Sequence, residues 1–125
     1  MIEIKQLKKG DYVLHKGEPA LITSIGLVVT GTHSHGKMKV QVRGLFSGTG
    51  DSFTLPLHER VQDVEIIRKL AQLIAKNPDN VQVMDMQSFE TITAEADKGL
   101  MQELSEGDNV TYVEFEGRAR VIEKR

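Results

Sequence analysis

Short runs of β-favouring residues alternate along this chain with turn signals rich in Gly, Pro, Asn and Asp, at intervals of roughly 8 to 12 residues. The first example is Tyr12 to His15, which Lys16-Gly17-Glu18-Pro19 turns back into an apolar run over residues 20–29. A two-residue turn with glycine in second place is typical of a β-hairpin. Repeated at this spacing, the pattern predicts an almost entirely β fold of sandwiches or small barrels.

The run from Met38 to Leu45 shows a regular alternation of apolar and polar residues. Because successive side chains of a strand point to opposite faces, one face is predicted to carry Lys39, Gln41 and Arg43, and the other Met38, Val40 and Val42. The polar face is therefore basic. A turn over Ser47–Ser52 and a strand over Phe53–Leu57 are predicted to follow, and residues 61–67 alternate again.

A second series of strands begins near Arg68. It is predicted over residues 69–75, 81–86, 91–93, 110–115 and 119–122, with one short helix over residues 94–104. The charge balance changes at the same place, since residues 1–67 hold 8 Lys/Arg and 7 Asp/Glu whereas residues 68–125 hold 8 and 11. We therefore predict two β domains, residues 1–66 and 67–125, joined near Val64 to Arg68.

The segment from Pro19 to Gly50 contains no Asp or Glu, although it contains Lys37, Lys39 and Arg43. A surface built from it carries a positive potential that no carboxylate nearby in the sequence cancels. Such a surface suits a polyanion such as RNA, and these three cations are the predicted RNA contacts.

Residues 28–38 form the predicted loop of this segment, and its small and imidazole side chains allow several chemistries. His33 and His35 alternate, but two imidazoles are too few for a zinc site. Ser34 has no acid nearby to orient a histidine base, and the glycines lack the spacing of a phosphate-binding loop. A simple hairpin tip and an RNA contact remain. The candidate loop residues are Thr30, Gly31, Thr32, His33, Ser34, His35 and Gly36.

Nothing in the sequence predicts a membrane span, a signal peptide or a resident cofactor. The longest apolar runs are far shorter than the roughly 18 residues of a spanning helix, and the N-terminus lacks the layout of a signal peptide. The chain has no cysteine, which fits a reducing compartment. We expect a cytoplasmic protein with no metal, no membrane contact and no catalytic site.

Several stretches together resemble the translation initiation factor 5A family of archaea and eukaryotes, relatives of bacterial elongation factor P. They lie along nearly the whole chain: Leu7–Val13, Gly17-Glu18-Pro19, Thr30-Gly31 with His33 and Lys37, Leu45–Gly48, Val83–Met86 and Phe89–Ile92. The resemblance implies an SH3-like barrel in the first domain, carrying the family's modification loop, and an OB-fold barrel in the second. OB-folds commonly bind oligonucleotides.

The resemblance also implies a function and exposes a departure. In this family a lysine at the loop tip is converted to hypusine, and its long cationic side chain reaches the peptidyl-tRNA on the ribosome. The matching position here is Thr32, whose hydroxyl has no amine to modify and no charge. Thr32 is either natural in a factor that works without hypusine or a replacement, or Lys37 supplies part of the contact; Lys37 falls where the family has another lysine.

Two classes of function follow from the resemblance. The first is a translation factor whose partners are the ribosome and peptidyl-tRNA. The second is a structural or RNA-binding homologue of the same fold without hypusine. The acid-free segment with Lys37, Lys39 and Arg43 favours the first, and no acid–base pair or cofactor motif favours an enzyme. A monomer is the working expectation, because nothing in the sequence indicates a self-association surface.

Overall fold

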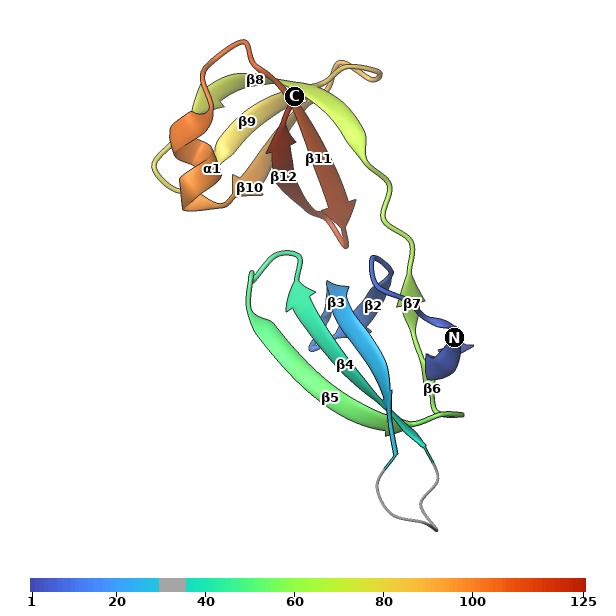
Figure 1. Cartoon of the computed structure of the whole chain (residues 1–125). Helices are drawn as coiled ribbons and strands as arrows, with labels where there is room; N and C mark the ends of the chain where they lie inside the picture. Colours follow the sequence, from blue (N-terminus) through green and yellow to red (C-terminus); the bar gives the residue numbers. More distant parts are fainter. Residues whose placement is uncertain (30–35) are drawn as a thin grey trace. The chain divides into compact units, whose positions relative to one another are not determined.

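The computed structural model describes residues 1–29 and 36–125, so the predicted loop residues from Thr30 to His35 lie outside the described part. The chain divides into two units, Met1–Glu65 and Ile66–Arg125. Both are built almost entirely of β-strands (Figure 1). No helix in the described part combines the length and the apolar character that a membrane span requires.

Unit 1 is a strongly curved antiparallel sheet in the order β5-β4-β3-β2-β7, with a small second pair formed by β1 and β6. This is the SH3-like barrel that was predicted. Its elements in chain order are β1 (Ile2–Glu3), the 3₁₀ helix η1 (Ile4–Gln6), β2 (Tyr12–His15), β3 (Glu18–Val28), β4 (Lys37–Gly44), β5 (Gly50–Pro56), β6 (Arg60–Val61) and β7 (Asp63–Val64).

The predicted first hairpin is confirmed. Strands β2 and β3 pair in antiparallel register, with His15 opposite Glu18, and Lys16 and Gly17 form the connection with φ of 52° and 81°. Positive φ at both central residues is the turn geometry whose twist matches the flanking strands. Glycine takes the second position at little cost because it has no Cβ to clash.

The core of unit 1 forms where the apolar faces of its strands meet. In β4 the burial alternates as predicted: Val40 and Val42 are buried, while Lys39, Gln41 and Arg43 are exposed. The buried cluster consists of Ile4, Leu7, Val13, Ala20, Ile22, Val40 and Val42. The cationic side of β4 is therefore fixed outward, because a slip by one residue would bury the cations and expose the valines.

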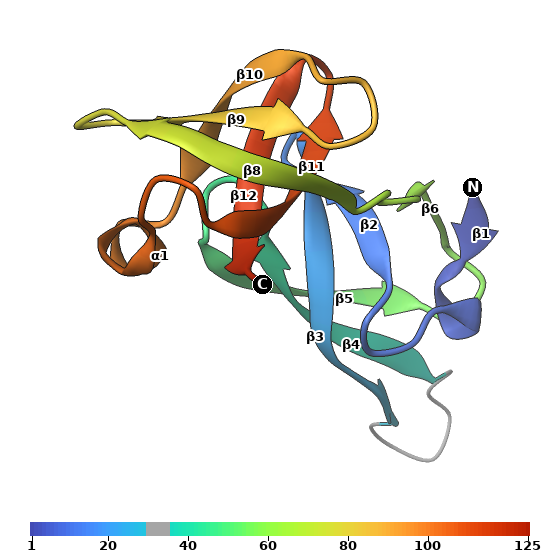
Figure 2. The same cartoon turned by 90° about the horizontal axis from the view of Figure 1, so that it is seen from above.

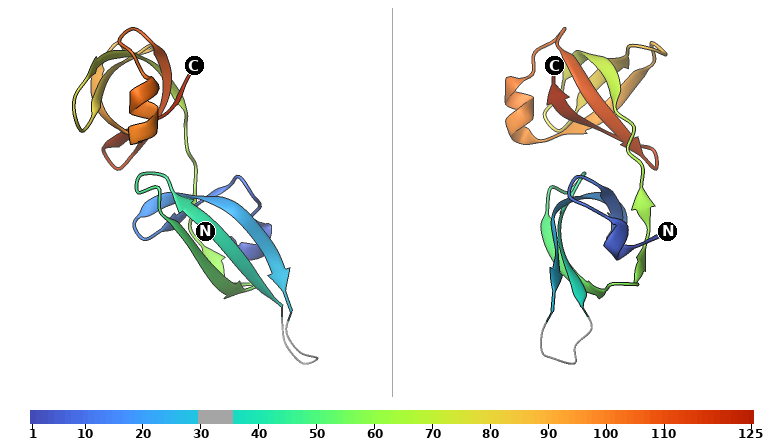
Figure 3. Two further views of the ribbon diagram at one scale, coloured as in Figure 1. Left: turned by 60° about the vertical axis from the view of Figure 1, so that its left-hand side comes forward. Right: turned by 45° about the vertical axis from the view of Figure 1, so that its right-hand side comes forward.

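Unit 2 is a closed five-stranded barrel in the order β10-β12-β11-β8-β9 (Figure 2). Its β10 and β12 are parallel and its other pairs antiparallel, the connectivity of the predicted OB-fold. The helix α1 lies outside the ring of strands (Figure 3). The elements are β8 (Lys69–Lys76), β9 (Val81–Asp85), β10 (Thr91–Ala96), α1 (Lys98–Glu103), β11 (Asn109–Phe115) and β12 (Arg118–Lys124).

Three predicted element boundaries are corrected by the structure. The helix expected over residues 94–104 begins only at Lys98, because β10 continues to Ala96 and pairs there with β12. The turn expected over Ser47–Ser52 ends at Thr49, since Gly50 already pairs with Arg43. The run 61–67 is not one strand but the short strands β6 and β7, separated by Gln62, whose carbonyl accepts the N–H of Leu14.

Candidate nucleic-acid interface

The outward side chains of β4 form what we call the cationic face, made of Lys37, Lys39, Gln41 and Arg43. Its neighbours on β3 and β5 follow from the strand register. Lys39 lies between Gly26 and Thr54, Gln41 between Ser24 and Ser52, and Arg43 between Leu21 and Gly50. Small or hydroxyl-bearing residues thus flank Lys39 and Gln41, whereas Arg43 has Leu21 on one side and Lys37 lies between Val28 and Pro56; in the described part of the chain no strand partner of these four residues is acidic.

Two shallow hollows lie along the cationic face. One, of about 460 Å³, is lined by Thr23, Gln41, Arg43 and Ser52, with Val42, Gly50 and Asp51. The other, of about 180 Å³, is lined by Ser24, Gly26, Lys39 and Gln41, with Leu27 and Val28. Gln41 belongs to both, so the hollows adjoin one another along β4. Hydroxyl, amide and guanidinium groups at such a surface can donate to phosphate oxygens and sugars.

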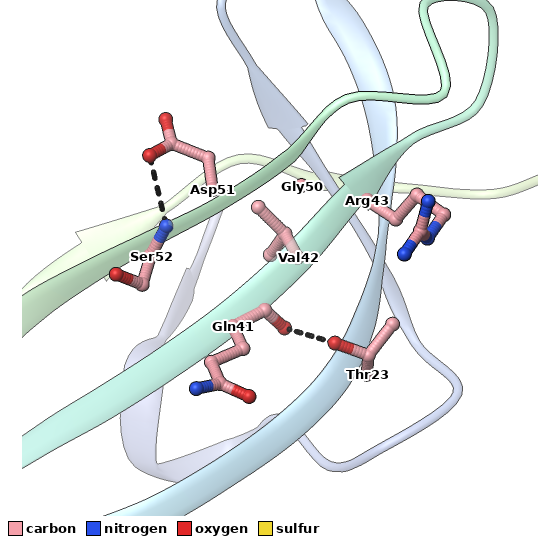
Figure 4. A pocket seen from close by; sticks show the side chains of 7 residues that line it. All are labelled: Thr23, Gln41, Val42, Arg43, Gly50, Asp51 and Ser52. Carbon is pink, nitrogen blue, oxygen red and sulfur yellow. Dashed lines mark hydrogen bonds between the residues drawn. The ribbon is translucent and has the colours of Figure 1, made fainter.

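Thr23 reaches this face because of an irregularity in β3. The register between β3 and β4 shifts between Ile22 and Ser24, so one extra residue is accommodated there. The hydroxyl of Thr23 donates to the carbonyl oxygen of Gln41 at 3.2 Å, a bond visible in Figure 4. The sequence prediction missed Thr23, Ser24, Ser52 and Thr54, because the position of β3 and β5 against β4 is not visible in the sequence of β4.

Arg43 is held in place by the turn that follows it. One guanidinium nitrogen of Arg43 donates to the carbonyl oxygen of Gly48 at 3.0 Å. That bond uses one of its five N–H donors and leaves the planar group oriented for further contacts. Within residues 1–29 and 36–125, no ion pair involves Lys37, Lys39 or Arg43. The three cations therefore keep their charge available to a ligand.

Asp51 is the one carboxylate in the wall of the larger hollow, and its charge is compensated by other groups. Its Oδ2 lies 2.8 Å from Nε2 of His15 and 2.9 Å from Nζ of Lys16. The bonds from His15, Lys16 and the Ser52 N–H hold the pKa of Asp51 well below its usual range. Figure 4 shows Asp51 and Arg43 on opposite sides of the hollow. Asp51 therefore cancels little of the positive potential of the cationic face.

The base of the predicted loop is described on both sides. Gly36 directly precedes β4, where an added Cβ would lie 2.9 Å from Cδ1 of Leu27 and 3.4 Å from Cδ1 of Leu57. An alanine here would meet the end of the exposed Leu27 side chain, which would have to move aside. Thr30, Gly31, Thr32, His33, Ser34 and His35 were predicted loop residues and lie outside the described residues. Lys37, Lys39 and Arg43 are brought together on one face, and Gly36 adjoins its end.

No cluster of three or more His, Cys, Asp or Glu side chains suited to a metal ion occurs in residues 1–29 and 36–125.

The fold and the site together define a class: small proteins that join an SH3-like barrel with a cationic sheet face to an OB-fold barrel. Comparison with known proteins makes the assignment more specific. No protein-family model matches the chain.

Individual relatives match nearly its whole length. It is 37% identical over 126 residues to translation initiation factor 5A of Pyrococcus horikoshii, covering 97% of this chain and 91% of the relative. It is 34% identical over 120 residues to that of Natronomonas pharaonis, covering 96% and 95%. The chain belongs to the translation initiation factor 5A family.

Solved structures agree with this assignment. The structure of eukaryotic translation initiation factor 5A from Methanococcus jannaschii matches with a TM-score of 0.84 at 30% identity, covering 99% of this chain and 92% of that one. A family protein from Naegleria fowleri matches with a TM-score of 0.77 at 23% identity, covering 99% and 96%, which supports the fold alone. The predicted family and the predicted all-β fold of two barrels are confirmed, and the relatives are translation factors.

Proposed function

We propose that this translation factor binds the ribosome through the cationic face of unit 1 and directs residues 30–35 toward the peptidyl-tRNA, promoting peptide-bond formation. The observation that carries the proposal is the outward row of Lys37, Lys39 and Arg43, which has no acidic strand neighbour in the described residues. Neutralising phosphates with such a row releases counterions and contributes a large share of RNA affinity. The hydroxyl and amide groups beside the row supply further donors for the RNA backbone.

A second part of the proposal concerns Thr32. We propose that it occupies the position at which the family carries its modified lysine, so that this chain docks without a hypusine side chain. Support comes from the resemblance of Thr30-Gly31 and His33 to the family's loop, and from the agreement over nearly the full chain with relatives of that name. Binding to the ribosome through the cationic face would then not depend on a modified side chain at the loop tip.

The first prediction tests docking by replacing Lys37, Lys39 and Arg43 together with alanine. Ribosome association is measured by co-sedimentation over a series of salt concentrations. Because each lost phosphate contact lowers the salt slope by about one unit, the triple variant is expected to bind more weakly and with a slope smaller by about three. Thr32→Lys is expected to leave docking near the parent level while creating a substrate for the hypusine-forming enzyme.

The matched control removes the same charge elsewhere. Lys8, Lys9 and Lys98 are exposed, and no ion pair in the described residues involves them, so their combined replacement by alanine tests net charge alone. It is expected to change the slope far less. Equal losses in both triple variants, or parent-like binding by the cationic-face variant at every salt concentration, would contradict the proposal. The structural or RNA-binding alternative would then become the better reading of this fold.

A further inference from the structure

The connection between β9 and β10 is a tightly bonded loop over Met86–Glu90. The carboxylate of Asp85 accepts the N–H groups of Gln87 and Ser88 on Oδ1, both at 2.8 Å, and the hydroxyl of Tyr112 on Oδ2. The Phe89 N–H donates to the Asp85 carbonyl at 2.8 Å, and the Asp85 N–H to the Glu90 carbonyl at 2.9 Å. The loop is therefore held in one conformation by side-chain and backbone bonds together.

Phe89 has a backbone conformation in this loop that phenylalanine rarely adopts. Its φ is 62°, in the left-handed region, where bulky side chains are rare and Gly, Asn or Asp are favoured. Its side chain is 67% exposed and contributes nothing to the barrel core. Folding of the loop would be served better by asparagine. Residues held in such a conformation without a folding benefit point to a contact outside the chain.

The surroundings of Phe89 are apolar as well. All the large exposed hydrophobic residues of unit 2 lie on β8, on the residues just before it, or on this loop; they are Ile67, Leu70, Ile74, Met86 and Phe89. The loop lies against the beginning of β8, where the Met86 N–H donates to the Leu70 carbonyl at 3.0 Å (Figure 2). We call Ile67, Leu70, Met86 and Phe89 the apolar loop surface.

A hollow of about 400 Å³ opens in this surface. Ile67, Leu70 and Met86 form its apolar wall, and its polar lining residues are Arg68, Lys69, Gln87 and Asp85, whose carboxylate is already bonded within the loop. The hollow is large enough for an apolar side chain, and the thioether of Met86 can adapt to the shape of what enters. Apolar surface gathered in this way commonly marks an interaction site.

The charges around the apolar loop surface favour a protein over RNA. Residues 84–93 contain Asp85 and Glu90 but no Lys or Arg, and Glu90 is exposed directly beside Phe89. The two cations of the hollow, Arg68 and Lys69, come instead from the start of β8 and the residue before it. Along β8, β9 and β10 the exposed or partly exposed charged side chains, Lys69, Lys76 and Glu95, lie at or near the strand ends, and the following exposed or partly exposed side chains are uncharged: Gln72, Gln82, Met84, Thr91 and Thr93. A base stacked on Phe89 would bring its phosphates toward Glu90 without the positive groove that binds single strands.

The charged side chains beside the hollow indicate which charges a bound segment would carry. Lys69 lies 3.7 Å from a carboxylate oxygen of Glu114. Arg68 and Glu90 form no ion pair with the described residues, so each is open to an opposite charge. We propose that the apolar loop surface docks a protein segment that inserts an apolar side chain into the hollow, with an acidic group facing Arg68 and a basic group facing Glu90. This goes beyond the ribosome docking proposed for unit 1.

The experiment selects phage-displayed random dodecapeptides on the full chain and measures the enriched peptides, labelled with fluorescein, by anisotropy. The expected peptides combine apolar residues with an acidic and a basic group. Phe89 does not line the hollow but is the most exposed side chain of the apolar loop surface, so Phe89→Asn is expected to weaken them about 10-fold, as loss of an aromatic interface contact does. Arg68→Gln is expected to weaken them about 3-fold, and Lys98→Gln, an exposed cation on α1, serves as the matched control.

A second measurement keeps folding separate from binding. Because asparagine tolerates a left-handed φ, Phe89→Asn is expected to unfold at a temperature no lower than the parent, so lost binding cannot be ascribed to lost structure. Fluorescein-labelled decauridylate tests the RNA alternative. The proposal is overturned if every enriched peptide binds Phe89→Asn as tightly as the parent, if none is enriched, or if Phe89→Asn weakens only decauridylate.

Discussion

Asp85 is a buried carboxylate that bonds the β9–β10 loop to β11. The hydroxyl of Tyr112 and the N–H groups of Ser88 and Gln87 stabilise its charged form and lower its pKa to about 2, against an ordinary value of 3.8. Burial, together with the bond to Asp85, raises the pKa of Tyr112 above its ordinary value. At neutral pH the pair is therefore a carboxylate bound to a neutral phenol, and the loop conformation depends on it.

The Asp85 pair predicts a defined dependence of stability on acid. A carboxyl whose pKa is lower in the folded chain contributes stability above its unfolded pKa, and that stability is lost as pH falls through the folded value. For Asp85 the loss spans about pH 4 to pH 2. Asp85→Asn is expected to lower the free energy of unfolding of unit 2 by roughly 2–3 kcal/mol at pH 7 and to flatten this region.

The measurement is urea unfolding at a series of pH values, followed by circular dichroism. Tyr112→Phe provides a second arm, because it removes the largest single contribution to the lowered pKa of Asp85 and leaves the ring in the core. In this variant the folded pKa of Asp85 lies closer to its unfolded value, so the acid loss is expected to be smaller than in the parent and to be complete at a higher pH. Stability curves for parent and Asp85→Asn that run parallel from pH 7 to pH 2 would rule out this role for Asp85.

At the scale of elements, the start of β3 fixes the turn between β4 and β5. The carboxylate of Glu18 accepts the N–H of Phe46 at 2.8 Å and the N–H of Ser47 at 3.0 Å. This arrangement requires glycine at position 44, since an added Cβ would lie 2.6 Å from Oε2 of Glu18 and would also meet the hydroxyl of Ser47. The turn carries Gly48, whose carbonyl orients Arg43 of the cationic face.

Gly44→Ala is therefore expected to destabilise unit 1 by about 1–3 kcal/mol, because the added methyl group must displace the Glu18 carboxylate from the turn. Gly26→Ala is the matched control, since nothing lies within 4 Å of a Cβ added at Gly26. It is expected to change stability by about 0.5 kcal/mol or less. Thermal unfolding of both variants measures the difference, and equal effects would show that Glu18 does not fix this turn.

Local pattern was sufficient for some elements and not for others. The alternation over Met38–Arg43 correctly predicted which side chains of β4 face outward, because one side of that strand packs on a core. The residues Ala94–Ala96 favour a helix locally but extend β10, where Glu95 and Ala96 pair with Arg120 and Val121. Pairing between segments so distant in the chain overrides a weak local preference. The helix then begins after Asp97, whose carboxylate accepts the Gly99 N–H.

For the candidate site, the sequence likewise predicted which side chains share a face of one strand but not the contacts between distant strands. Lys39 and Arg43 share a face because of a period of two, which the sequence displays. The compensation of Asp51 by His15 and Lys16 was not predictable, since it joins β5 to β2 and its turn across two intervening strands. The exposed position of Phe89 was likewise hidden, because a left-handed backbone at a phenylalanine has no signal in the sequence.

At the scale of the whole molecule, the described residues form two separate buried clusters. One is formed within Met1–Glu65 and includes Ile4, Val13 and Val40, and the other is formed within Ile66–Arg125 and includes Leu73 and Tyr112. No residue belongs to both. Cooperative unfolding follows the core that a segment helps to bury, so each unit is expected to open as its own cooperative unit.

The two destabilising substitutions, one in each unit, distinguish separate opening of the units from cooperative unfolding of the whole chain. Asp85→Asn is expected to raise amide exchange throughout β8–β12 and leave β2–β5 at parent rates, and Gly44→Ala is expected to do the reverse, because neither change touches the other buried cluster. Hydrogen exchange with peptide-resolved mass spectrometry measures both units in one full-length sample. If either substitution accelerated exchange equally in both units, the chain would unfold as a single cooperative unit. Docking by unit 1 could then not be altered without also altering the loop surface of unit 2.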